Sequence, residues 1–66
     1  MNIEIEREED GRWIAKVLDL PGVMAYGQSR TEAITKAEAL ALRVLADRIE
    51  HGEVIPEIRQ DFAVPA

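Results

Sequence analysis

The fold is decided by residues 11–29, which read GRWIAKVLDLPGVMAYGQS. Residues 12–18 alternate, with Trp13, Ala15 and Val17 on one side, and a period of two is typical of a half-buried strand. Adjacent proline and glycine then predict a tight reversal, and residues 23–27 predict a short third strand that ends at Gly27. The residues of the reversal are Asp19, Leu20, Pro21 and Gly22.

Residues 2–8 predict the first strand, since Ile3 and Ile5 alternate with glutamates. Two loops are compatible with the step to the next strand. A two-residue Asp10–Gly11 turn places the glutamates beside the apolar face of residues 13–17. A three-residue loop over residues 9–11, with Gly11 in the left-handed conformation, separates charged from apolar side chains. We expect the three-residue loop.

Residues 30 to about 51 predict a helix. Ser29 has the side chain of an N-cap, and Glu32 stands three residues later, which is the spacing of a capping box. Gly52 is placed to end the helix in the left-handed conformation. The expected buried stripe recurs at three- and four-residue steps and comprises Ala33, Ile34, Ala37, Leu40, Ala41, Val44 and Leu45.

Residues 57–64 alternate again, and we interpret them as a fourth strand. The predicted order is β-β-β-α-β, an α+β two-layer fold with one helix on one face of an antiparallel-rich sheet. Residues 1–66 form a single domain in this interpretation, because so short a chain has no room for a second core. We expect Trp13 and Phe62 to anchor that core, while Tyr26 fits either the core or an interface.

Thirteen acidic residues against eight basic ones give a net charge of −5. This balance disfavours direct DNA or RNA binding, which needs a basic footprint, and favours a basic protein partner. The chain has no cysteine, signal peptide or apolar run long enough to span a membrane, so we expect a cytoplasmic protein. A chain of this length has marginal stability, and we expect a homo-oligomer, either a dimer or a tetramer.

The chain offers little catalytic chemistry. His51 is the only side chain that titrates near neutrality, and its place at the end of the helix favours a capping role over catalysis. Ser29 is explained by helix initiation. The acidic run Glu4, Glu6, Glu8, Glu9 and Asp10 is interpreted as a solvated strand face and not as a metal site, which needs converging oxygens. We therefore expect no enzymatic activity, metal or cofactor.

Several apolar residues lie off the predicted core. Ile14 and Leu18 alternate onto the outer face of the sheet, and Leu42 and Ile49 fall on the flank of the helical stripe. Exposed apolar groups gathered in one patch usually mark a partner surface. We expect a partner or a second copy to contact Ile14, Leu18, Tyr26, Leu42 and Ile49.

The order of these motifs resembles the HicB antitoxin family. The shared features are an aromatic-containing strand, the reversal at residues 19–22, a short strand, and Gly27 before a helix that opens Ser29, Thr31, Glu32. The likeness spans nearly the whole chain. The four residues of the reversal alone would be a weak likeness. Their placement between two strands and ahead of this helix makes the likeness more specific.

The resemblance implies a partly degenerate RNase H-like fold that binds HicA, a small basic ribonuclease toxin, and masks its active site. Typical members continue into a C-terminal DNA-binding segment. None follows Ala66 in this sequence, so we do not expect operator binding by this polypeptide. An alternative is an orphan HicB-like domain that self-associates and has no toxin partner.

Overall fold

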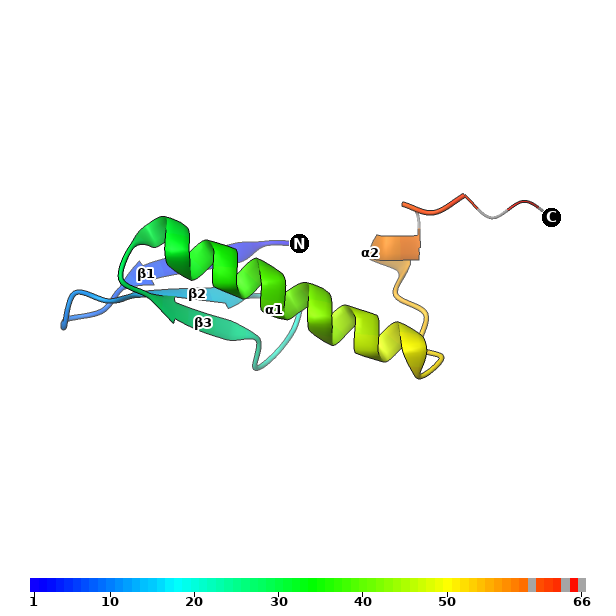
Figure 1. The fold of residues 1–66 in the computed structure, drawn as a ribbon, viewed down its shortest axis with the longest axis horizontal. Coiled ribbons are helices and arrows are strands. Elements are labelled where there is room, and N and C mark those ends of the chain that lie inside the picture. Colours follow the sequence, from blue (N-terminus) through cyan, green and yellow to red (C-terminus); the bar gives the residue numbers. More distant parts are fainter. Residues whose placement is uncertain (60, 64, 66) are drawn as a thin grey trace.

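The computed structural model, which describes residues 1–59, 61–63 and 65, has an α+β architecture. Strands β1 (Ile3–Arg7), β2 (Trp13–Val17) and β3 (Met24–Gly27) form an antiparallel sheet in the order β1-β2-β3. Helix α1 (Arg30–Glu50) packs on one face of this sheet, as Figure 1 shows. The predicted α+β class and the first four elements are confirmed, with each boundary within one residue.

The β1–β2 register is the one that the three-residue loop requires. Ile3 lies opposite Val17, and Ile5 lies opposite Ala15. The backbone N–H of Glu8 donates to the carbonyl of Arg12 at 2.7 Å, which closes the loop over residues 9–11. Gly11 has a φ of 92°. Apolar side chains of both strands therefore share the face that α1 covers, and the glutamates of β1 share the other face.

The reversal between β2 and β3 has the hydrogen bond and the dihedral angle of a type II turn. The N–H of Val23 donates to the carbonyl of Leu20 at 3.0 Å. Pro21 and Gly22 occupy the two central positions, and Gly22 has a φ of 85°, which a residue with a side chain rarely adopts. Asp19 accepts a hydrogen bond from the N–H of Asn2 at 2.8 Å, so the turn also holds the start of β1.

Helix α1 lies close to the sheet because small residues face it. Ala33 and Ala37 are completely buried, and Gly27 at the end of β3 lies against the first turn of the helix. A Cβ atom built on Gly27 would lie 2.5 Å from the backbone nitrogen of Ala33. Any side chain at residue 27 therefore pushes the helix away from β3.

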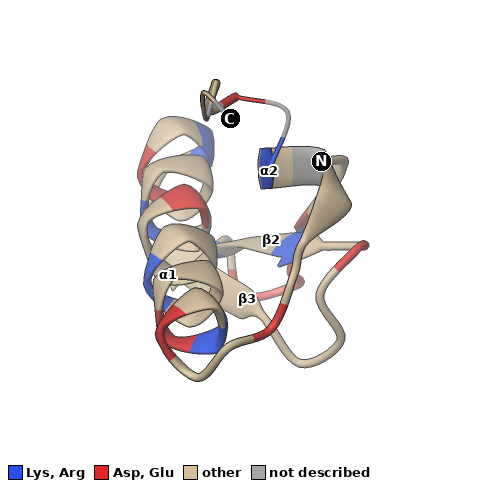
Figure 2. Ribbon diagram, turned by 90° about the vertical axis from the view of Figure 1, so that its right-hand side faces the viewer, with Lys and Arg blue, Asp and Glu red and all other residues tan. Residues whose placement is uncertain are grey.

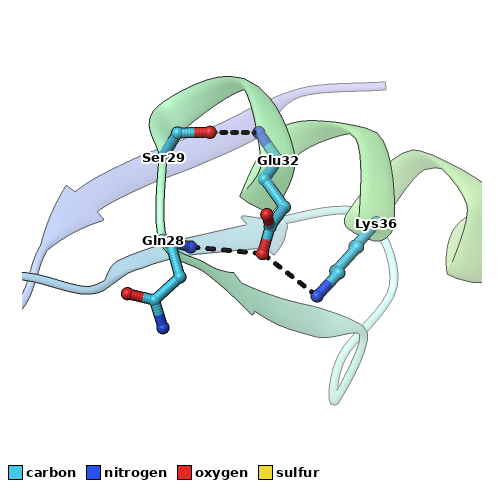
Figure 3. A network of polar contacts seen from close by, with 4 residues as sticks. All are labelled: Gln28, Ser29, Glu32 and Lys36. Atoms are coloured by element: carbon cyan, nitrogen blue, oxygen red, sulfur yellow. Dashed lines mark hydrogen bonds and ion pairs between the residues drawn. The ribbon is translucent and has the colours of Figure 1, made fainter.

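Both ends of α1 are capped as the sequence indicates. The Ser29 hydroxyl accepts a hydrogen bond from the N–H of Glu32 at 3.0 Å (Figure 3). The Glu32 carboxylate accepts from the N–H of Gln28 at 3.2 Å, one residue before the expected partner of a capping box. At the other end, Gly52 with a φ of 87° and the bond from Glu53 N–H to Arg48 O complete a Schellman motif.

The predicted fourth strand is wrong. Residues Pro56–Arg59 form a short helix, α2, and the bonds from Asp61 N–H and Phe62 N–H continue the turns. Ile58 and Phe62 are four residues apart, a spacing that places them on one face of a helix as well as on one face of a strand. Pro56 favours the helix, because its fixed φ suits the first helical position. Gln60 and Val64, which the prediction also covered, lie outside the described residues.

Helix α1 is too long for the sheet. Its 21 residues extend about 31 Å, whereas a five-residue strand extends about 17 Å. The second half of α1 therefore projects beyond the strands, toward α2, which Figure 1 shows clearly. Leu45 still reaches the core from this half, but the expected anchor Phe62 is 66% exposed, so that prediction is wrong. Trp13 is half-buried and packs against the core.

Candidate protein-binding surface

Several polar side chains of the described residues serve helix ends and turns. His51 Nδ1 lies 2.7 Å from the carbonyl oxygen of Asp47, in the last turn of α1, and the ring is exposed. The Ser29 hydroxyl is engaged by the N–H of Glu32. Over residues 1–59, 61–63 and 65, no three His, Cys, Asp or Glu side chains come together as a metal site. His51 and Ser29 therefore serve the two ends of α1.

Two carboxylates have a pKa below the ordinary value. The backbone N–H of Arg12 lowers the pKa of Asp10, and the Arg12 guanidinium, 2.7 Å away, adds to this effect. The backbone N–H of Gln28 lowers the pKa of Glu32, with a further contribution from Lys36 at 3.2 Å. Figure 3 shows Gln28 and Lys36 approaching the same Glu32 carboxylate. Both carboxylates hold local backbone structure in place, one at the hairpin loop and one at the helix start.

The outer face of the sheet has no helix over it in the described part of the chain. Tyr26 lies on this face, opposite Ile14, and the Arg12 guanidinium stacks 4.5 Å from the centre of its ring. Tyr26 and Leu18 are exposed, which resolves the open choice for Tyr26 in favour of the surface. Ile14 is on the predicted face, but its expected exposure is wrong. It is only 3% exposed, because its cross-strand neighbours Glu6 and Tyr26 have longer side chains that flank it.

A second apolar surface lies on the projecting half of α1 and the segment after it. Leu42 and Ile49 are exposed as predicted, and the structure adds Val54 and Phe62. We call these four residues the overhang patch. A hollow of about 350 Å³ lies beside it and is lined by Ile49, Val54 and Phe62 among others. Nothing in the sequence marks Val54 as a surface residue, since residues 54–56 fit a plain connection between the helix and the next element.

Another hollow separates β1 from α1. It measures about 330 Å³. It exists because α1 packs mainly on β3 and β2 and makes few contacts with β1. The inner face of β1 is thus less covered than the rest of the sheet. The hollow is lined by Met1, Ile3, Val17, Glu38, Ala41, Leu42, Leu45, Ile58 and Asp61.

Charge is distributed unevenly over these elements. Residues 1–19, which contain the β1–β2 hairpin, have six acidic and three basic residues, a net −3. Helix α1 has four of each, a net zero, and its acidic and basic residues are interspersed (Figure 2). Residues 51–66 have three acidic residues and one basic residue, a net −2. The excess negative charge therefore belongs to the hairpin and the C-terminal segment, which precede and follow the helix in the sequence.

The comparisons with known proteins give no relative: no family model, curated protein or solved structure matches this chain. Within the described residues, neither helix is long and apolar enough to cross a bilayer.

Proposed function

We propose that this chain is a HicB-like antitoxin domain that binds a small basic HicA-type ribonuclease and masks it. The observation that carries the proposal is the acidic hairpin, whose charge is not neutralised by the helix behind it. A basic protein is steered to such a surface and held there by complementary charge. The order of strands, Pro-Gly reversal and capped helix supports the family assignment.

The proposal concerns binding and not catalysis. Asp10, Ser29 and His51 are engaged in caps and turns. The apolar groups left on the surface, Leu18 and Tyr26 on the sheet and the overhang patch, suit contact with another protein. We place the interaction in the cytoplasm, since the chain needs no disulfide.

The test is a mixture of the purified protein with a purified HicA-type ribonuclease. At low salt we expect one peak in size exclusion that contains both chains, and loss of the toxin's RNA cleavage as the domain is added. Raising the salt concentration should weaken the complex, because exposed charges are screened. Separate peaks at low salt, or undiminished cleavage at saturation, would contradict the proposal.

The overhang patch favours a second candidate function, a self-associating module without a toxin partner. This patch is an exposed apolar area on the projecting half of α1 and the segment after it, where another copy has access. Light scattering over a range of concentrations tests this candidate. A monomer at every concentration would exclude it, and a dimer that Leu42→Glu dissociates would support it.

A further inference from the structure

Strand β1 has a free hydrogen-bonding edge. The N–H of Leu18 donates to Asn2 O, and the N–H of Glu8 donates to Arg12 O, so the even-numbered residues of β1 bond to β2. In an antiparallel pair the intervening residues direct both backbone groups to the opposite edge. The N–H and C=O groups of Ile3, Ile5 and Arg7 therefore point away from the sheet, where no strand pairs with them among the described residues.

The outer face of this edge is acidic. Glu4 and Glu6 are both exposed there, and no ion pair joins either of them to a cation in the part of the chain that the structure describes. The opposite edge of the sheet differs, because β3 reads MAYG and has no charged residue. The two free edges thus offer similar backbone groups with different side-chain charge.

A second copy is a poor occupant for the β1 edge. The outward backbone groups belong to odd-numbered residues, so two antiparallel β1 strands would pair odd with odd and even with even. In every register centred on the strand, Glu4 or Glu6 then lies opposite a glutamate of the other copy. Like charges directly opposite one another destabilise a strand pair. The same geometry favours a strand with lysine or arginine at those positions.

The inner side of the edge has space for apolar side chains. The hollow between β1 and α1 is lined by apolar side chains of both elements, among them Ile3 and Leu45. Its charged groups are Glu38 and Asp61, which are acidic as well. Alternate residues of an added strand point to this side, as they do in any strand. An added strand that alternates between basic and apolar residues therefore meets glutamates on one face and the hollow on the other.

We propose that the free edge of β1 binds an extended, alternately basic and apolar segment of the partner as a fourth strand of the sheet. This mode, strand addition, obtains affinity from backbone hydrogen bonds and specificity from the alternating side chains. The inference deepens the proposed function, since it rests on the same basic partner and assigns the edge that holds it.

The first experiment uses an acetylated nine-residue peptide of alternating lysine and valine and follows the backbone amides of the labelled protein by NMR. We expect the amide shifts and the slowed hydrogen exchange to concentrate on Ile3, Ile5 and Arg7. Shifts confined to Met24 and Tyr26 on the other edge, or no binding at millimolar peptide, would overturn the proposal.

Proline variants separate the two edges. Arg7→Pro removes an outward N–H without breaking a bond to β2, and Met24→Pro is its matched control on β3. Arg7→Pro is expected to weaken peptide binding about tenfold or more, since proline cannot donate to an added strand, whereas Met24→Pro leaves it unchanged. Equal binding by both variants, each checked for a native spectrum, contradicts the assignment of the edge.

A charge variant tests the same edge without a proline substitution in the strand. The double variant Glu4→Lys, Glu6→Lys should lose about tenfold in affinity for the peptide, because attraction becomes repulsion at both positions. The double variant Glu50→Lys, Glu53→Lys changes the net charge by the same amount at the end of α1 and should change affinity less than about threefold. Similar losses in both variants would mean that only net charge matters and would overturn the edge proposal.

The HicA-type protein then distinguishes this inference from the proposed function. If it binds the wild type and Arg7→Pro equally, the edge proposal fails and the proposed function stands. If it binds neither while the peptide binds the wild type at β1, the proposed function fails and the edge proposal stands. A wild-type dimer that Arg7→Pro converts to a monomer would show a second copy on the edge and overturn the proposal.

Discussion

The two halves of α1 share one apolar stripe but have different surroundings. Up to Ala41 the helix lies over the sheet, and Ala33, Ala37 and Ala41 are buried there. From Leu42 onward it projects past the strands, and apolar residues remain exposed between those that reach the core. A helical apolar stripe thus shows which residues share a face, but the length of the neighbouring sheet decides how many of them are covered.

The sharpest test of this comparison is a pair of leucines in the projecting half. Leu45 is 3% exposed and Leu42 is 65% exposed. Leu45→Ala should destabilise the domain by about 2–4 kcal/mol, because it leaves a cavity in the core. Leu42→Ala should change the free energy of unfolding by less than about 0.5 kcal/mol. Urea denaturation of both variants measures the difference, and equal losses would contradict the orientation of the helix.

Gly27 tests the covered half. Gly27→Ala should destabilise the domain by about 1–3 kcal/mol, since the added methyl group meets the backbone of Ala33 and the helix must move. Gln28→Ala, at the adjacent exposed position, is the control and should be nearly neutral. The readout is thermal unfolding by circular dichroism. A Gly27→Ala protein as stable as the wild type would mean that α1 is not held close to β3.

Substitutions at Ser29 test the cap at the N-terminus of α1, where the covered half begins. Ser29→Ala should cost about 1 kcal/mol, because the N–H of Glu32 loses its partner. Ser29→Asp should restore most of that stability, since aspartate is an equally good N-cap. Chemical denaturation of the two variants provides the comparison. Loss of stability in the aspartate variant as large as in the alanine variant would argue against the capping role.

The smallest effect concerns pH. Hydrogen bonds from Gln28 N–H and Lys36 lower the pKa of Glu32 in the folded protein, so its ionised form favours folding. This contribution is complete above the ordinary value of 4.5 and is lost as the pH falls through the lowered folded-state pKa. The melting temperature of the wild type should exceed that of Glu32→Gln at pH 7, and the two should converge in acid. A gap that persists well below that pKa would exclude this cause.

The sequence predicts the strands and the helix of the first fifty residues correctly, because several local signals favour the same arrangement there. Alternation, the requirement for apolar and charged faces to separate, and the Ser29 and Gly52 caps all select one arrangement. After Gly52 the spacing of the apolar residues is compatible with both a helix and a strand. Ile58 and Phe62 share a face in a helix and also in a strand, and only their surroundings decide between the two.

The candidate surface shows the same limit. The exposure of Leu18, Leu42 and Ile49 follows from their position off the apolar stripes. The burial of Ile14 does not, because it depends on the sizes of its neighbours across two strands. The free edge of β1 was also not predictable, since the sequence placed a fourth strand in the sheet.

The most direct measurement for the central claim, that the acidic hairpin binds a basic protein, is a calorimetric titration of the HicA-type protein into the domain at low and high salt. We expect saturable binding at low salt, and this binding should weaken as the salt concentration rises. The Glu4→Lys, Glu6→Lys variant should no longer bind. Absence of binding at low salt, or binding unchanged by salt and by these substitutions, would contradict the account.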